Sequence, residues 1–435
     1  MKKQNLTETA TGSAVSRKSR WSWYAYDFGN SAYASVVLLA VYSAFFKNVV
    51  VGGAEGTRLW GISVAIAAIV VAIISPVLGT VADFTQSKKK FLIVFSGVAI
   101  VFTASLFFVG KGDVFQGMLF FILAEIGYRG AQVFYDALLV DVSTPQTIGS
   151  VSGKGWAAGM IGGVVALLLV LLPIQLIGNQ VVPYAFFMTA GIYLLASIPT
   201  FLWTVEHRHG EAPAPGTSLI RMAFRNLLGT FRAVKHYKEF VKYMVAFLVY
   251  NDGIMMLMDF AAIIGATLYG MGQVQLIIFV IIIHISGTFG ALFFGRFSDR
   301  KSSKEAIAFA VLLLIASVCC LFFIQDIKLF YVVGIAVGFF LTGAQAISRA
   351  MVSQLAPVGK TAEFYGFLSV AGRTSTFVGP LVFGTISFRA HNWYANHGYA
   401  SLQAEQLGLL WAIGSILLFL VVGLVLLLFV KKERA

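Results

Sequence analysis

The stretch Leu123-Ala-Glu-Ile-Gly-Tyr-Arg-Gly-Ala-Gln-Val-Phe-Tyr-Asp136 places polar side chains inside a long apolar segment. Its polar residues are Glu125, Arg129, Gln132 and Asp136, and their spacing puts all of them on one face of an α-helix. Because charges are costly in hydrocarbon, such a face is expected to look into a bundle interior or a water-filled cavity. The pattern therefore indicates a pathway or a substrate site. The alternative is a static buried ion pair between Glu125 and Arg129.

The composition around this stretch is that of a helical membrane protein. The chain is 58% hydrophobic and 12% charged, with a mean hydropathy of +0.84, whereas soluble domains usually carry about a quarter charged residues. The apolar runs are about twenty residues long, which is the length of a membrane-spanning helix, and they do not alternate like the strands of a β-barrel.

About twelve apolar segments can be distinguished, and they predict an all-α membrane protein with two six-helix bundles. The segments are expected at 21–50, 59–82, 91–109, 114–142, 152–172, 183–204, 241–269, 273–297, 305–325, 329–352, 364–388 and 406–430. We therefore expect bundles over 21–204 and 241–430, with cytoplasmic tails at 1–20 and 431–435. The basic linker at 205–240 is expected to carry an amphipathic helix on the membrane surface, or else to be a solvated connector.

Four pairs of short motifs recur in the same order in both halves, which indicates an internal duplication. The pairs are Gly79-x-x-x-Asp83 with Gly295-x-x-x-Asp299, Gly130-Ala131-Gln132 with Gly343-Ala344-Gln345, Val151-x-Gly153-Lys154 with Val370-x-Gly372-Arg373, and Tyr26-Asp27 with Tyr250-Asn251. Each match is weak by itself, but the shared order supports two related six-helix halves.

The distribution of basic residues predicts the orientation. If both termini are cytoplasmic, most lysines and arginines fall on the cytoplasmic face, and the opposite face keeps only a handful, which are Lys47, Arg58, Lys111, Lys328 and Arg389. This bias accounts for the net charge of +13. We therefore expect the lipid bilayer as a partner, and no nucleic acid.

The same motifs carry a family resemblance that covers the whole chain. The two halves, the basic central loop and the repeated Gly-x-x-x-Asp loops resemble the major facilitator superfamily. Within it, the chain resembles the vacuole-effluxer-like branch, which includes the fungal autophagy-related vacuolar amino-acid effluxer. The motifs behind this resemblance are Tyr26-Asp-Phe-Gly-Asn-Ser-Ala-Tyr33, Tyr250-Asn-Asp-Gly253, Gln345-Ala-Ile-Ser-Arg349, Glu363-Phe-Tyr-Gly366 and Gly379-Pro380. The chain departs from the branch at Asp136, where an amide is expected.

The resemblance implies a secondary transporter that moves small polar metabolites, amino acids by analogy, through a site near the bilayer midplane. For such a cargo, Arg129 is expected to bind the carboxylate, and Asp252 or Asp27 the amine. Candidate cargo contacts are Tyr26, Asn30, Arg129, Gln132, Tyr250, Asn251 and Asp252, with Tyr135 and Trp156 as further possible lining residues. Most single aromatic residues in so aromatic a chain serve packing instead.

Asp27, Glu125 and Asp252 are the candidate proton carriers. Burial favours the neutral form of a carboxylate and a nearby cation favours its charged form, so a moving arginine can couple protonation to conformation. For Asp27 the alternative is structural, either capping of backbone groups or pairing with a loop lysine.

Four residues are candidates for a cytoplasmic gate. Under the repeat, Asp136 corresponds to Arg349, and the two are hypothesised to pair in the outward-facing state. The alternative pairs each residue within its own half, for instance Asp136 with Lys154, whose counterpart is Arg373. The resemblance also implies that Asp83 and Asp299 bind to helix N-termini of the opposite half as conformational latches.

The sequence carries no pattern typical of an enzyme, and neither a cofactor nor a metal is expected. His207, His209, His391 and His397 lack partners at ligand spacing, the adjacent Cys319 and Cys320 suit buried free thiols, and no nucleotide-binding loop is present. We expect a monomer in a bacterial inner membrane. Two other readings stay open, a lipid or lysolipid flippase on the same fold and a receptor or structural protein that moves nothing.

Overall fold

Long apolar runs must satisfy their backbone hydrogen bonds internally, and the chain does so by forming helices. The computed structural model describes residues 16–85, 87–143, 148–206, 237–355, 372 and 377–431. The helices of the first half are α1 (Arg17–Tyr33), η1 (Ala34–Ala40), α2 (Tyr42–Phe45), η2 (Phe46–Val51), α3 (Gly53–Thr85), α4 (Lys88–Ser105), η3 (Leu106–Phe108), α5 (Val114–Ala137), α6 (Leu139–Val142), α7 (Ile148–Ile177), η4 (Asn179–Val181) and α8 (Val182–Trp203). Those of the second half are α10 (Lys238–Tyr269), α11 (Gln273–Arg300), α12 (Ser303–Cys320), α13 (Ile327–Leu355), α15 (Val378–Asn396) and α16 (Ser401–Leu428).

Each of the twelve predicted segments overlaps a helix of the described structure, and the all-α membrane fold is confirmed. The first segment is longer than predicted and is interrupted, because η1 and η2 are π-helical. Ten of the described helical segments are long and apolar enough to cross a membrane. The helix α5 is outside that set, as is α15, and α5 is the helix whose polar face opened the sequence analysis.

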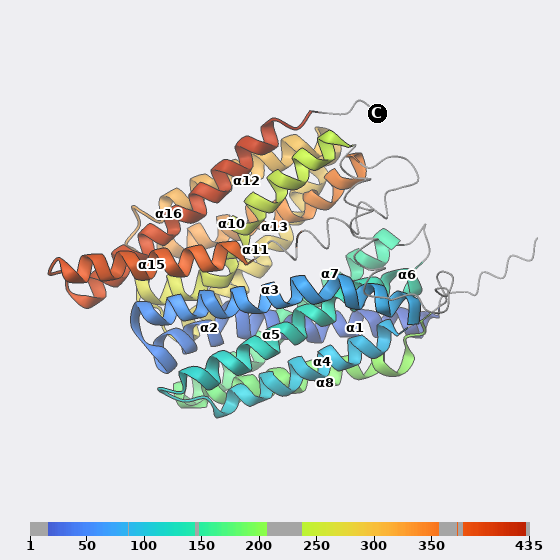
Figure 1. Cartoon of the computed structure of the whole chain (residues 1–435), viewed down its shortest axis with the longest axis horizontal. Helices are drawn as coiled ribbons and strands as arrows, with labels where there is room; N and C mark the ends of the chain where they lie inside the picture. Colours follow the sequence, from blue (N-terminus) through green and yellow to red (C-terminus); the bar gives the residue numbers. More distant parts are fainter. Residues whose placement is uncertain are drawn as a thin grey trace, which may run out of the picture.

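The helices pack in two groups (Figure 1). In the first group, α1 packs against α7 and α8, α3 packs against α5, and α4 packs against α5 and α8. In the second group, α10 packs against α16, α11 packs against α13, and α12 packs against α13 and α16. These partners follow the same order in both groups, as a duplication predicts. The boundary predicted at 205–240 stays a prediction, since residues 207–236 lie outside the described part of the chain.

The two groups contact each other through α3 with α15 and α7 with α11. At Gly61 of α3, an added Cβ would overlap the carbonyl oxygen of Pro380 in α15, so the two helices touch at backbone distance. The Trp60 indole also donates a hydrogen bond of 2.8 Å to the Asp259 carbonyl in α10. We call this region, residues 40–61 with 259–273 and 380–408, the closed end.

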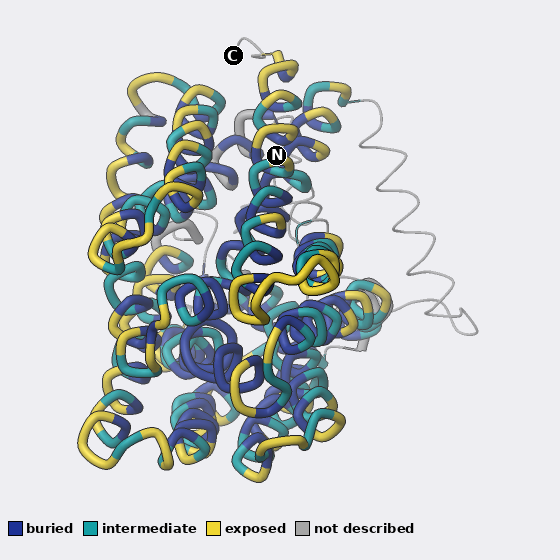
Figure 2. The backbone as a smooth tube through the Cα atoms, turned by 90° about the vertical axis from the view of Figure 1, so that its left-hand side faces the viewer, coloured by how far each residue is buried: buried dark blue, intermediate teal, exposed yellow. Residues whose placement is uncertain are grey.

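The termini lie away from the closed end. In Figure 1 the two groups spread apart toward the end where α1 begins and α16 finishes. Figure 2 views the molecule from the closed end and shows buried backbone at its centre, with exposed positions on the connecting turns and the outer helix faces. The exposed outer faces carry large apolar side chains such as Phe108, Leu195 and Phe323, which suits contact with lipid.

Candidate functional site

The polar face of α5 forms a buried ion pair at its centre. The guanidinium of Arg129 donates to Glu125 one helical turn away. The Glu125 side chain is fully buried and the Arg129 side chain is only 12% exposed. The intrahelical pair named as the static alternative is therefore present. It does not exhaust the role of Arg129, because a carboxylate of the other helix group also acts on it.

That carboxylate is Asp259 of α10, which lies close enough to Arg129 and Glu125 for electrostatic interaction across the two groups. Asp252 lies seven residues earlier on the same helix, so the two side chains share a face at a separation of about 10 Å. They are 3% and 2% exposed, respectively. Within the described residues, one carboxylate oxygen of each lacks a hydrogen-bond partner.

A tyrosine shell surrounds the Glu125–Arg129 pair. The rings of Tyr33 and Tyr128 stack at 4.6 Å between centroids, and Tyr33 interacts with Glu125. The amide of Gln132 donates a hydrogen bond of 2.9 Å to the Tyr128 hydroxyl. Gln132 is thus held beside the tyrosine that packs next to the ion pair, on the helix face that the spacing predicted.

Other predicted cargo contacts are buried in different ways. Asn30 of α1 is 1% exposed, and its amide oxygen has no partner among the described residues. Asn251 is buried beside Asp252. The Tyr26 hydroxyl bonds to Ser96 and Tyr193, which ties α1 to α4 and α8.

The Tyr250 hydroxyl is engaged in the same manner. It bonds to the Ser348 hydroxyl of α13 at 2.7 Å. Both hydroxyls, of Tyr26 and of Tyr250, are therefore committed to helix packing in this conformation. Trp156 is exposed on α7, and Tyr135 stacks between Trp23 and Tyr26.

The remaining acidic and basic candidates occupy other positions in the fold. Asp27 lies against Gly159 of α7, on the packing surface between α1 and α7, and interacts electrostatically with Tyr128 and Tyr135. Asp136 and Lys154 are exposed. The side chains of Asp83, Asp299 and Arg349 lie outside what the structure describes, as does all of Arg373, so the gate and the latches stay predictions.

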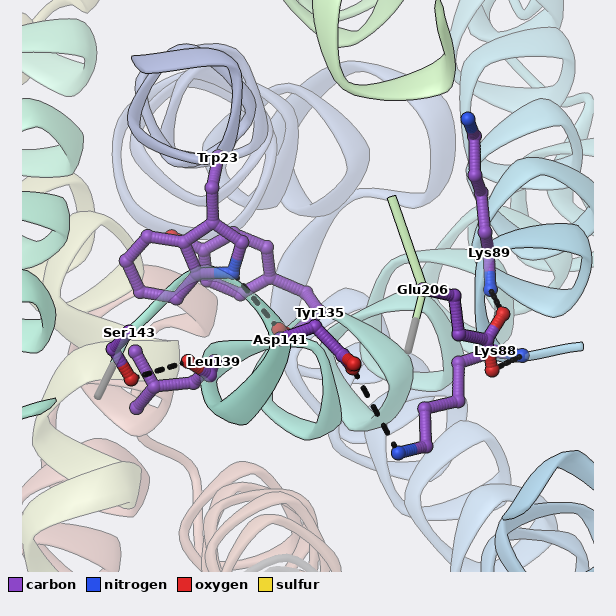
Figure 3. A network of polar contacts seen from close by, with 8 residues as sticks. All are labelled: Trp23, Lys88, Lys89, Tyr135, Leu139, Asp141, Ser143 and Glu206. Atoms are coloured by element: carbon purple, nitrogen blue, oxygen red, sulfur yellow. Dashed lines mark hydrogen bonds and ion pairs between the residues drawn. The ribbon is translucent and has the colours of Figure 1, made fainter. Parts of the chain in front are cut away.

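A carboxylate at a helix N-terminus does occur at the open end of the first group, although at another residue. Figure 3 shows Glu206 accepting hydrogen bonds from the backbone N–H groups of Lys88 and Lys89, at 3.1 and 3.3 Å, where α4 begins. The Lys88 ammonium lies 3.9 Å from Asp141 of α6. These contacts hold α4, α6 and the residues after α8 together within one group.

A half-buried histidine lies at the contact between the groups. The Nε2 atom of His284 in α11 lies 3.3 Å from the Ser35 hydroxyl of η1, and its Nδ1 atom lies 2.9 Å from the Val280 carbonyl. The Val280 carbonyl can only accept, so Nδ1 carries a proton and donates to it. Through the contact between Nε2 and the Ser35 hydroxyl, the ring joins the two groups.

Sequence reasoning missed Asp259 and His284. The spacing of seven residues after Asp252 was the available signal for Asp259, since it returns to the same helix face. Among the described residues, no group of three or more His, Cys, Asp and Glu side chains could hold a metal ion.

Comparison with known sequences gives a family match over most of the chain. The model of the family described as "Vacuole effluxer Atg22 like" matches residues 58–148 and 140–435. An uncharacterized MFS-type transporter of Bacillus subtilis, YxiO, is 27% identical over 96% of this chain and 96% of its own length. Autophagy-related protein 22 of the yeast Yarrowia lipolytica is 25% identical over 56% of this chain, which is 46% of the fungal protein.

Comparison with solved structures supports the fold. A crystal structure of a mutant of the nucleoside transporter NupG superposes with a TM-score of 0.68 and 14% identity. The match covers 94% of this chain and 99% of that one. At this identity the likeness concerns the fold alone.

Proposed function

The chain belongs to the vacuole effluxer Atg22-like family, and from that premise we propose that it moves a small polar metabolite bearing an amine, such as an amino acid. It is an integral membrane transporter of the MFS type. The proposal adds the cargo, the mechanism of alternating access and the coupling to protons. The matched proteins give no support to the flippase alternative, and none of them is described as an enzyme.

One observation carries the proposal, namely the buried polar cluster that both helix groups build. The first group contributes Glu125 and Arg129, and the second contributes Asp252 and Asp259. Buried charges in a membrane are costly and usually mark substrate or ion pathways. A cluster divided between two helix groups changes its geometry whenever the groups rock, which is the requirement for alternating access.

We assign the cargo carboxylate to Arg129 and the amine to Asp252. Arg129 is already paired with Glu125, so a cargo carboxylate has to compete with that side chain. A proton on Glu125 removes the competing charge and leaves Arg129 to the cargo. In this scheme the proton and the cargo bind together, which couples transport to a proton gradient. Asp259 holds Arg129 electrostatically when neither is bound.

The conformational cycle follows from the two groups. In the conformation described here the groups meet at the closed end and spread apart at the other end. We propose that the open end faces the cytoplasm of a bacterial cell, with both termini there, and that Asp136 and Arg349 pair when this end closes. Asp83 and Asp299 are the proposed latches, and the protein works as a monomer.

The test is ligand-induced thermal stabilisation of the purified protein. A panel of amino acids, peptides, sugars, nucleosides and lysolipids is screened at pH 5.5 and pH 7.5, since a ligand of the folded state raises stability with its occupancy. We expect stabilisation by an amino acid, stronger at pH 5.5, and its loss in Arg129→Ala. Stabilisation by lysolipids alone would contradict the proposal, and stabilisation by sugars alone would contradict the assigned roles of Arg129 and Asp252.

A further inference from the structure

We propose that the ion pair between Lys47 and Glu405 is the lock of the closed end, which has to break before the transporter can open there. The Lys47 ammonium in η2 lies 2.5 Å from the Glu405 carboxylate in α16. The side chains are 7% and 9% exposed, respectively. The pair joins the first membrane segment of one helix group to the last segment of the other.

Each partner is fixed within its own group, so the pair bridges two rigid bodies. The Lys47 carbonyl accepts a hydrogen bond of 2.9 Å from the Gly52 backbone N–H, and an added Cβ at Gly56 would lie 2.7 Å from the same carbonyl oxygen. On the other side, Gln406 donates to the Thr267 carbonyl at the end of α10. A motion that separates the groups at this end must therefore separate the two charges.

Burial makes this pair specific for the closed conformation. An ion pair with little access to water is held by strong attraction, and removing one partner leaves an uncompensated buried charge. When the groups separate, water reaches both side chains and solvates each charge, so the charges no longer depend on pairing. The pair thus stabilises the closed end and not the open one, which is the property that a lock requires.

Four further ion pairs of the described structure lack this arrangement, because each joins residues of the same helix group. They are Glu55 with Arg58, Lys88 with Asp141, Glu125 with Arg129, and Glu239 with Lys242. The Glu239–Lys242 pair is the control, because it lies within α10 and the Lys242 side chain is 44% exposed. The Glu55–Arg58 pair is unsuitable, because the Arg58 guanidinium also lies 4.5 Å from the centre of the Phe388 ring in α15 of the other group.

The further contacts at the closed end are of another kind. They are helix approaches through glycine, as at Gly61, and hydrogen bonds to backbone carbonyls, as from Trp60 to Asp259 and from Gln273 to Ala40. The Arg58 guanidinium also lies over the Phe388 ring of α15, a contact that needs no opposite charge. Such contacts set how closely the groups can approach. An ion pair adds a contribution that a single charge substitution can remove while the backbone contacts stay in place.

The experiment measures the separation of the groups directly. Spin labels are placed at Lys111→Cys and Ala400→Cys, two exposed turn positions near the pair, in a chain with Cys319→Ser and Cys320→Ser. Pulsed electron-spin distance measurements then compare the parent with Lys47→Gln, with Glu405→Gln and with the swapped pair Lys47→Glu/Glu405→Lys. Glu239→Gln, which breaks an ion pair within α10, is the matched control.

The distance between the labels is short when the closed end is shut and long when the groups separate there. We expect each single variant to raise the ratio of long to short distances by about tenfold or more, since each leaves a buried charge unpaired. The swapped pair is expected to restore the parent distance distribution, and Glu239→Gln to leave it unchanged. If folded Lys47→Gln or Glu405→Gln shows the same label-to-label distances as the parent, the proposal is overturned. If neither single variant folds, the proposal is overturned by a folded swapped pair whose labels lie mainly at the long distance. The outcome is independent of the cargo, so it is separable from the proposed function.

Discussion

At Arg129, two carboxylates of different origin act on one cation. Glu125 belongs to the same helix and pairs with it directly, whereas Asp259 reaches it from the opposite helix group. The interaction between Glu125 and Arg129 persists through any rigid-body motion of the groups, because both residues belong to α5. The interaction between Asp259 and Arg129 changes whenever the groups move relative to each other. Arg129 is therefore a residue at which cargo, proton and conformation can influence one another.

The first prediction concerns Glu125→Gln, which keeps the shape of the side chain and removes its charge. Arg129 then loses its intrahelical competitor, so a carboxylate ligand should bind about tenfold tighter at pH 7.5. The gain in its affinity between pH 7.5 and pH 5.5 should also become smaller than in the parent. Isothermal titration with the ligand from the stability screen measures both effects. The control Asp326→Asn, at an exposed carboxylate, should behave as the parent, and a parental pH dependence in Glu125→Gln would refute the coupling role.

The second prediction concerns Asp252→Asn. A charge-assisted hydrogen bond to an amine contributes roughly 1.5–3 kcal/mol, so the variant should bind an amino acid about ten- to a hundredfold more weakly. Binding of the analogue that lacks the amine should not change. Titration of both ligands into the parent and the variant provides the comparison. Equal losses for the two ligands would argue against the amine role, and Glu239→Gln at the exposed start of the same helix is the control.

How far the site could be predicted differs from residue to residue. The helical spacing of Glu125, Arg129 and Gln132 was enough to place them on one face, because a period of 3.6 residues needs no knowledge of neighbours. Contacts between the two helix groups could not be predicted from the sequence. The approach of Asp259 to Arg129, and of Lys47 to Glu405, depends on how two bundles are packed, which no local pattern encodes.

At the scale of single elements, glycine sets the distance between α1 and α7. An added Cβ at Gly162 would overlap the carbonyl oxygen of Phe28, so the two helices are in backbone contact there. The sequence offers glycines at 159, 162 and 163, which are small enough to allow such an approach. The sequence did not predict the π-helical stretches of the first segment, because a mostly apolar run shows too little periodicity for its winding to be inferred.

The third prediction follows from this contact. Gly162→Leu must push α1 and α7 apart, and overpacking of this kind typically costs about 1–3 kcal/mol. Thermal unfolding in detergent should show a clear fall in Tm for this variant. The matched control is Gly97→Ala in α4, where an added Cβ has open space around it. Equal Tm values for Gly162→Leu and the parent would mean that the α1–α7 contact is looser than described.

At the scale of the whole molecule, the two helix groups explain why the polar residues sit where they do. The duplicated motifs predicted two related six-helix halves, and the helices pack with corresponding partners in both groups. The conformation of the molecule could not be predicted from the sequence. The same sequence encodes every conformation of an alternating-access cycle, whereas a structure shows one of them. Here the closed end holds the Lys47–Glu405 pair, and the cluster around Arg129 lies between the groups.

The central claim is that a proton gradient drives an amine-bearing cargo through the Arg129 cluster. Uptake of that labelled cargo into proteoliposomes, with an acidic exterior and a neutral interior, tests it most directly. The parent should accumulate cargo above its external concentration, a protonophore should abolish the accumulation, and Arg129→Ala should show background uptake. Accumulation that a protonophore does not affect, or that persists in Arg129→Ala, would contradict the account.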